Sequence, residues 1–113
     1  MKIIYVAGPY RNQSESKVLD NVIAAKQVAR RLWKNGWGVI CPHMNSCLID
    51  GSDIPEERFA NGYLEILGRC DAIVLLEGWQ RSIGSLAELT LALKLGIQIY
   101  YEEKEVPNCE ELG

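Results

Sequence analysis

The chain has 113 residues, of which 48% are hydrophobic, and a formal net charge of -3 at pH 7. This length and composition predict a single domain over residues 1–113, with a small core that homo-oligomerisation would supplement. The negative balance provides no basic field for a nucleic acid polymer, and no apolar run reaches the ~18 residues of a membrane span. Strand-like residues follow Met1-Lys2 directly, without a secretory leader pattern, so we expect a cytoplasmic protein.

The first part of the chain predicts a strand followed by a long helix. Residues 2–7 form an apolar run that Gly8-Pro9 closes, which indicates a buried strand and a turn. A helix begins at Ser14 or Ser16, runs to about Asn35 and ends at Gly36. One face of this helix is apolar and is made up of Val18, Val22, Ala25, Ala29 and Leu32.

The middle of the chain begins with a short strand over residues 39–41, which Pro42 ends. Residues 43–54 predict a loop, because residues 50–53 combine Asp, Gly and Ser in a composition typical of turns. Pro55 is a favoured first helical residue and begins a second helix. The partial apolar face of this helix consists of Phe59, Leu64 and Leu67.

The last part of the chain predicts a strand over residues 72–76, a helix over residues 85–95 and a strand over residues 97–101. Gly96 ends the helix. The acidic tail from Glu102 onward predicts a loose end or a contact arm.

Strands that alternate with amphipathic helices predict an α/β fold, a doubly wound (Rossmann- or flavodoxin-like) parallel sheet of four to five strands with flanking helices. Such sheets bind ligands beyond the carboxyl ends of the strands, where the strand order reverses. If the first and third strands are neighbours, residues 8–11 and the loop that leads to Glu88 face one crevice.

Residues 78–88 are the most informative stretch, because a small-residue loop connects an apolar strand to a helix. This arrangement is a ready anion site, in which Ser82, Gly84 and free amides could hold phosphate oxygens; plain turn residues are the alternative. Glu88 also has two interpretations. It could close a capping box with Ser85, or it could be a functional carboxylate, because an unpartnered charge on so apolar a helix is costly.

Several other side chains have both a structural and a functional interpretation. Tyr5 fits a core position, and its hydroxyl, if buried, needs a partner such as a nearby carboxylate. Arg11 is either a solvated charge or a bidentate partner for a phosphate. His43 is either structural or in contact with a base or sugar, and Trp37 and Trp79 either pack or stack on a base.

The cysteines do not form a recognised metal-binding pattern. Cys41, His43 and Cys47 are conceivable ligands, but their spacing is irregular and a fourth ligand is missing. We therefore predict no metal and no cofactor. Cys41 and Cys70 end or precede apolar runs, which favours small buried hydrophobic side chains.

Over nearly its whole length the sequence resembles the nucleoside 2-deoxyribosyltransferase superfamily, and most closely its small phage and bacterial members, which are related to nucleoside monophosphate N-glycosidases. The motifs that carry this resemblance are Tyr5-Val6-Ala7-Gly8-Pro9-Tyr10-Arg11, Pro42-His43, Asp71-Ala72, and Gly78-Trp79 through Ser82, Gly84, Ser85 and Glu88.

The resemblance implies cleavage of the N-glycosidic bond of a nucleotide or nucleoside. Glu88 would form a covalent glycosyl-enzyme, Tyr5 would orient it, and water or a second base would resolve the intermediate. The implied substrate is a nucleoside 5′-monophosphate, and in many members a neighbouring subunit completes the site, so a homodimer or larger homo-oligomer is expected. The alternative is a nucleotide-binding or sensing module without catalysis. The expected substrate-binding residues are Gly8, Pro9, Tyr10, Arg11, His43, Trp79, Ser82, Gly84 and Ser85.

The sequence departs from the superfamily at one position. Members usually carry an aspartate on the helix before the third strand, where it assists departure of the base. By spacing, Tyr63 occupies that position here, and Asp53 in the preceding loop is the candidate replacement. Without an acid at this point, the base would leave slowly.

Overall fold

A parallel β-sheet forms the centre of the molecule. The structure is a computed structural model that describes residues 1–46, 49 and 53–112. In this part of the chain four strands, β1 (Ile3–Ala7), β2 (Gly38–Ile40), β3 (Ala72–Leu75) and β4 (Gln98–Tyr100), pair in the order β2-β1-β3-β4. All three pairings are parallel. The predicted doubly wound sheet is therefore confirmed, with four strands.

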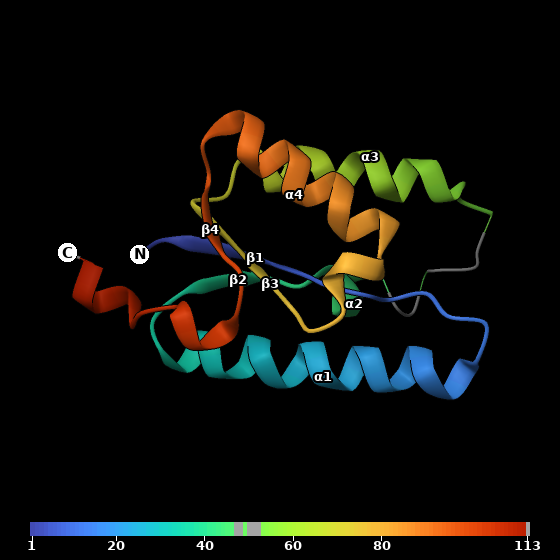
Figure 1. The fold of residues 1–113 in the computed structure, drawn as a ribbon, viewed down its shortest axis with the longest axis horizontal. Helices are drawn as coiled ribbons and strands as arrows, with labels where there is room; N and C mark the ends of the chain where they lie inside the picture. The colour runs from blue at the N-terminus through green and yellow to red at the C-terminus, as the bar shows by residue number, and fades with distance from the viewer. Residues whose placement is uncertain (47–48, 50–52, 113) are drawn as a thin grey trace.

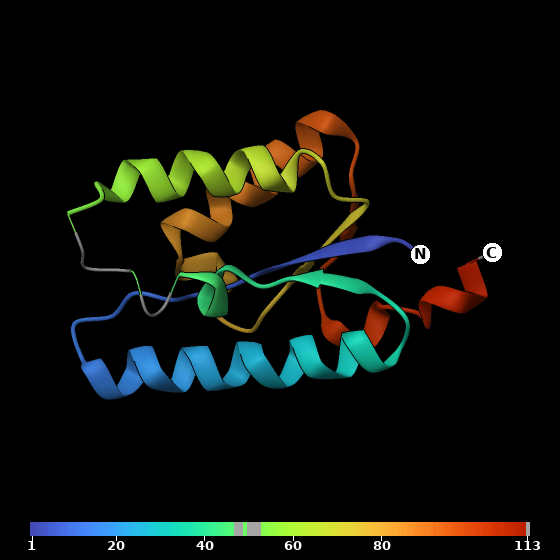
Figure 2. The ribbon, with the colours of Figure 1, turned by 180° about the vertical axis from the view of Figure 1, so that it is seen from behind.

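Helices cover both faces of the sheet, as Figure 1 shows from one side and Figure 2 from the opposite side. One face is covered by α1 (Glu15–Lys34), and the other by α3 (Glu56–Leu67) and α4 (Ile83–Leu95). Because β1 and β3 are neighbours while α1 and α4 lie on opposite faces, the strand order reverses between these two strands. This is the position at which such sheets bind ligands.

The core has one layer on each face of the sheet, and β1 contributes to both because successive side chains of a strand point in opposite directions. Ile4 and Val6 pack in the cluster that includes α1 residues, whereas Tyr5 and Ala7 pack in the cluster that includes residues of α3 and α4. The alternation of β1 therefore places the Tyr5 ring on the same face as α4.

Helix α1 agrees closely with its prediction. Ser14 is its N-terminal cap and Asn35 its C-terminal cap. The Ser14 side chain bonds to the Ser16 hydroxyl at 2.9 Å and makes no capping bond to a backbone amide. Gly36 follows with φ +90°, a left-handed conformation that glycine adopts without strain. In the predicted apolar face Ala25, Ala29 and Leu32 are buried and Val18 and Val22 are half-buried.

The loop predicted over residues 43–54 is only partly correct. Strand β2 covers Gly38–Ile40, one residue earlier than predicted at each end, and Cys41 is the cap of a one-turn helix, α2 (Pro42–Asn45). Pro42 begins this helix because proline is pre-organised for the first helical position. Pro55 lies just before α3 rather than inside it. The predicted turn at residues 50–53 is described only at Asp53, since residues 50–52 lie outside the described part.

Of the two alternatives predicted for the C-terminal tail, a loose end or a contact arm, the loose end is wrong for the residues described. The Trp37 indole donates from Nε1 to the carbonyl of Pro107 at 2.9 Å, and Cys109 is buried against the same layer. Arg31 on α1 forms a two-point ion pair with Glu103. Trp37, which sequence analysis offered as a base-stacking residue, is 1% exposed and belongs to the core. Within the described ranges no helix is long and apolar enough to cross a membrane.

Candidate functional site

The loops that follow β1 and β3 touch at the carboxyl edge of the sheet. The Leu76 amide donates to the Ala7 carbonyl at 2.8 Å, which continues the pairing of the two strands past their ends. A methyl group at Gly8 would lie 2.6 Å from Leu76 Cβ, so only glycine fits this contact. Gly78, with φ +88°, lies against Pro9 from the other loop. The two loops therefore face one another, as the sequence predicted for neighbouring strands.

A tyrosine–glutamate pair lies beside this junction. The Tyr5 hydroxyl donates to Oε2 of Glu88, which projects from α4. Tyr5 is fully buried and Glu88 is half-buried. Burial raises the pKa of Glu88 to about 7, and the hydrogen bond from Tyr5 opposes that rise. Burial and the Glu88 charge raise the pKa of Tyr5, so the phenol is the donor.

The capping-box interpretation of Glu88 is wrong, because α4 begins earlier than predicted. Ser82 is the N-terminal cap, and its side-chain oxygen accepts from the Ser85 amide at 3.2 Å. The Ser85 hydroxyl, itself buried, donates to the same oxygen at 2.9 Å. The helix starts at Ile83, so Glu88 lies in its second turn, where the terminal amides are out of reach. Its side chain pairs with Tyr5 instead.

The beginning of α4 leaves its backbone open to approach. A methyl group at Gly84 would meet no heavy atom of the described residues within 4 Å. The preceding 3₁₀ turn (Trp79–Arg81) places the half-buried Trp79 ring 6.0 Å from the Tyr101 ring. The surface at Gly84 is therefore open, beside the amino-terminal end of a helix, where anions are favoured.

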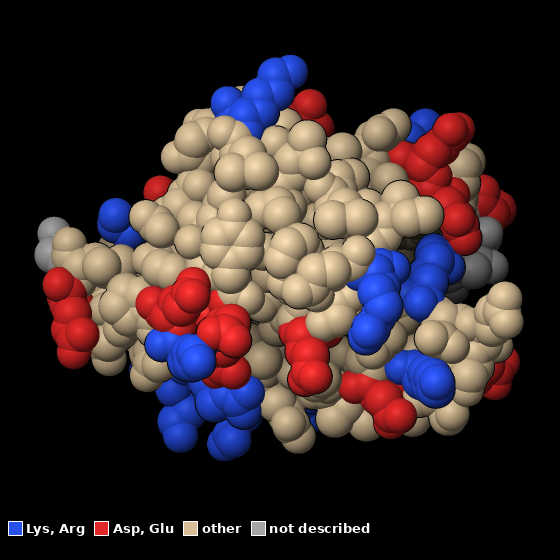
Figure 3. Space-filling model, viewed as in Figure 1, with Lys and Arg blue, Asp and Glu red and all other residues tan. Residues whose placement is uncertain are grey.

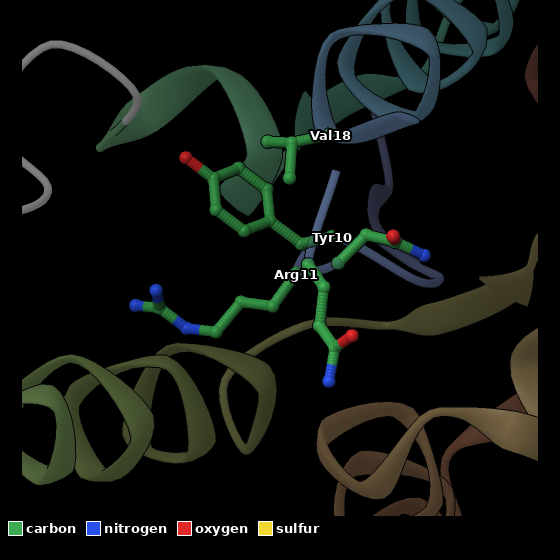
Figure 4. Close-up of a pocket in the computed structure, with 5 residues that line it drawn as sticks. Tyr10, Arg11 and Val18 are labelled. Carbon is green, nitrogen blue, oxygen red and sulfur yellow. The ribbon is translucent and has the colours of Figure 1, made fainter. Parts of the chain in front are cut away.

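Tyr10 and Arg11 line a hollow beside the carboxyl edge of the sheet. The hollow has a volume of about 460 Å³ and is bounded by the β1–α1 loop and the first turn of α1. Figure 4 shows the two side chains diverging from the loop. The Arg11 guanidinium lies 5.7 Å from the centre of the Tyr10 ring and forms an exposed ion pair with Glu56 at 3.2 Å. Arg11 therefore connects this loop to the start of α3.

His43 holds the glycine–proline turn from behind. Its Nε2 donates to the Pro9 carbonyl at 2.9 Å, and its ring lies edge-on to Tyr10. Burial lowers the pKa of His43, so the imidazole is neutral. The ring is 3% exposed, and its Nδ1 has no hydrogen-bond partner among the described residues. In this conformation His43 supports the loop, and the expected contact with a base stays a prediction.

Tyr63 enters the same region from α3. Its ring packs against the cluster that contains Tyr5, and its hydroxyl donates to the Pro42 carbonyl at 3.4 Å. The Asn45 amide donates to the Tyr63 oxygen at 3.3 Å. Electrostatic interaction with Tyr63 adds to the raised pKa of Tyr5. The sequence offers no signal for Asn45, because residues 43–54 carry no pattern beyond that of a loop.

The comparisons with known proteins place the chain in a family. A family model matches residues 2–101. The chain belongs to DUF4406, a family described as a domain of unknown function. No curated protein matches it.

Solved structures resemble this DUF4406 chain over most of its length. A 2-deoxyribosyltransferase from the bacterium Bacillus psychrosaccharolyticus matches with a TM-score of 0.60 and 25% identity, over 86% of this chain and 69% of that one. A conserved protein from Enterococcus faecalis V583 matches with a TM-score of 0.62 and 26% identity, over 88% of this chain and 61% of its own length. These matches confirm the predicted nucleoside 2-deoxyribosyltransferase-like fold.

No candidate metal centre is found in the described part of this DUF4406 chain. There, no three side chains of His, Cys, Asp or Glu come together as ligands would. Cys41 is buried as predicted, whereas Cys70 is only half-buried and donates to the Ile66 carbonyl. Cys47, the remaining ligand considered from the sequence, lies outside the described residues.

Proposed function

We propose that this DUF4406 protein cleaves the N-glycosidic bond of a nucleotide or nucleoside, with a nucleoside 5′-monophosphate as its substrate class. The observation that carries the proposal is the Glu88 carboxyl, withdrawn from water and held by Tyr5 where two strand-end loops meet. Similarity to a 2-deoxyribosyltransferase supports the same class of chemistry, transfer of a glycosyl group from nitrogen.

The pair suits nucleophilic catalysis in two steps. Oε1 of ionised Glu88 attacks the anomeric carbon, the bond from that carbon to the base nitrogen breaks, and its electron pair leaves with the base. The sugar is then held as an ester. Water or a second base attacks the same carbon, and the carboxylate is released. Because Tyr5 binds Oε2, it orients the carboxyl with Oε1 toward the attack.

A 5′-phosphate fits the amino-terminal end of α4. The partial positive charge of the 13-residue helix and its first free amides favour an anion there. Gly84 gives the phosphate room to approach, and the Ser82 hydroxyl, the cap of the helix, lies at the same point. Gly8 and Arg11 would complete this phosphate site from the opposite loop. The other residues assigned to substrate are Pro9, Tyr10, His43, Trp79 and Ser85.

A nucleotide-binding or sensing module without catalysis is the second candidate. It is favoured by one observation, the phenol of Tyr63 at the position where the superfamily carries a carboxylic acid. Under this alternative the same loops hold a nucleotide that is recovered intact. A thermal shift with nucleotide, together with no release of base, would support the module.

The deciding experiment is chromatography of free base after incubation with ribo- and deoxynucleoside monophosphates and free nucleosides. Wild type should release base, and Glu88→Gln should not, since an amide is a poor nucleophile. Glu65→Gln is a matched control, because Glu65 is an exposed glutamate of α3 that pairs with Arg69. Full activity in Glu88→Gln would overturn the assignment. If wild type releases base from only one group of substrates, that group identifies the preferred base and sugar.

We also propose that the protein acts as a homo-oligomer, with the outward face of α4 as the contact. Ile83 is 87% exposed and Leu93 60% exposed on this helix, and Leu86 is exposed as well. Figure 3 shows the surface over α4 without a cluster of charge, whereas acidic and basic side chains gather lower on the same view. Burying such a face against a second copy would stabilise a chain with a small core. No nucleic acid polymer, membrane or cofactor is part of the proposal.

A further inference from the structure

Breaking an N-glycosidic bond requires more than a nucleophile. The base leaves with the electron pair of the bond, and an anionic base is a poor leaving group unless it receives a proton. A positioned acid contributes about 10²–10⁴-fold to such a step. The proposed function therefore leaves one role unfilled, the group that gives this proton.

Four polar side chains on this side of the molecule already direct their hydrogens to other groups of the protein. The Tyr5 hydroxyl donates to Glu88 itself, the Ser85 hydroxyl donates to Ser82, and the His43 Nε2 hydrogen is directed to the Pro9 carbonyl. The Cys70 thiol donates to the Ile66 carbonyl. Each of these groups therefore donates its hydrogen to another group of the protein.

The Tyr63 hydroxyl is held less tightly. Its bond to the Pro42 carbonyl is 3.4 Å long, near the limit of a hydrogen bond, and its side chain is half-buried rather than enclosed. The ring packs in the same cluster as Tyr5, on the face of the sheet that carries α4. A phenol hydroxyl is both a donor and an acceptor of hydrogen bonds.

We propose that Tyr63 is the acid that protonates the departing base, with Asn45 stabilising the phenolate that results. This inference rests on the proposed function. As the carbon–nitrogen bond breaks, the base nitrogen takes the proton from Tyr63, and the Asn45 amide continues to donate to the phenolate oxygen. When water attacks the anomeric carbon, the bond from that carbon to Glu88 breaks, the carboxylate is released, and the phenolate takes one proton from the water. One water is consumed, and the products are the free base and the sugar with a 1-hydroxyl group.

The test compares substrates that need this proton with matched substrates that need it less. The pairs are dGMP with N7-methyl-dGMP, whose methylated base leaves without an added proton, and dUMP with 5-fluoro-dUMP, whose base leaves more readily. Tyr63→Phe should lower kcat/KM by about 100-fold on dGMP or dUMP. On N7-methyl-dGMP and 5-fluoro-dUMP the substitution should lower kcat/KM far less, by about threefold or under for N7-methyl-dGMP.

Two control variants accompany Tyr63→Phe. Asp53→Asn removes the carboxylate that sequence analysis offered as the replacement acid, and it should leave kcat/KM near the wild-type value on every substrate. Glu88→Gln should abolish release from all of them. Thermal unfolding of each variant shows whether the fold is retained.

The outcomes separate the two proposals. An equal loss on both members of a pair would make Tyr63 a structural residue and overturn this inference, as would selective loss in Asp53→Asn instead. If Glu88→Gln abolishes the release of base and Tyr63→Phe leaves it unchanged, the inference about Tyr63 is wrong and the proposed function stands. No release by wild type from any substrate would remove both.

Discussion

At the scale of single residues, the properties of Glu88 result from a balance between burial and one hydrogen bond. Removal from water disfavours the charged carboxylate, and the Tyr5 hydroxyl favours it. Burial wins, and the pKa of Glu88 rises to about 7. The carboxyl is therefore only partly ionised near neutral pH. As the Glu88 carboxyl ionises, we expect kcat/KM to rise and the free energy of unfolding to fall.

The first prediction concerns the pH dependence of activity. Only the ionised carboxyl attacks carbon, so kcat/KM should rise as pH increases and reach half its plateau near the pKa of about 7. A pH–rate profile on the best nucleotide from the base-release panel measures this. A profile already flat from about pH 5 upward would show that the nucleophile has an ordinary carboxyl pKa.

The second prediction concerns the stability of Glu88→Gln. The pKa of Glu88 is higher in the folded state than its ordinary value of 4.5, so the folded state binds more protons between these values. Its contribution to stability is therefore present in acid and is lost as pH rises through about 7. Glutamine escapes this loss and can still accept from Tyr5. At about pH 8.5 the variant should be more stable than wild type, by on the order of 2 kcal/mol.

Urea unfolding of both proteins at about pH 8.5 and pH 5 measures the difference. The advantage of the variant should shrink at the lower pH, where wild-type Glu88 is largely protonated as well. A variant that is less stable than wild type at both values would show that the ionised carboxylate stabilises the fold.

At the scale of elements, the start of α4 decides what Glu88 does. Both Ser82 and Ser85 are good caps by composition, and each is followed by apolar helix-forming residues. Residue spacing alone does not choose between them. With Ser82 as the cap, Glu88 lies in the second turn, directed toward Tyr5 across the sheet layer. A cap at Ser85 produced the capping-box alternative for Glu88, and the observed cap at Ser82 excludes that alternative.

The third prediction compares two caps. Ser82→Ala should destabilise the protein by about 1 kcal/mol, because it removes the acceptor for the Ser85 amide. Ser14→Ala is the matched control, since the exposed Ser14 hydroxyl bonds to the Ser16 hydroxyl and makes no capping bond to a backbone amide of α1, and its cost should be less than half as large. Denaturant midpoints of the two variants test the difference. Equal losses would mean that the Ser82 side chain contributes no more than the Ser14 side chain.

At the scale of the whole molecule, local patterns predicted the elements, and distant contacts determined the site. Apolar runs and helical spacing were enough for β1 and α1, because burial imposes the period of each element. The bond between Tyr5 and Glu88 spans 83 positions, and only the strand order brings the two together. The resemblance to a family suggested this pair, whereas periodicity did not. The packing of the tail was not resolved from the sequence, because its partners Trp37 and Arg31 lie about 70 positions away in the chain.

The fourth prediction concerns assembly. If α4 forms the contact between copies, Leu93→Lys should convert the oligomer to a monomer, because the new charge would be buried in the interface. Leu19→Lys on α1 is the matched control, since Leu19 is 58% exposed and Leu93 60% exposed. Sedimentation velocity distinguishes the two variants. An unchanged assembly in Leu93→Lys would exclude this face of α4 as the contact.

The close approach of Gly8 to Leu76 also predicts which residues related sequences carry at these two positions. Because a single added carbon at position 8 would overlap the Leu76 side chain, the two positions share one volume. The nearest atom is the Leu76 Cβ, which every residue except glycine carries, so a relative with a side chain at position 8 would have to carry glycine at position 76 or separate its two loops. Family members that keep this junction should therefore have glycine at one of the two positions. An alignment of DUF4406 sequences at positions 8 and 76 would test this expectation.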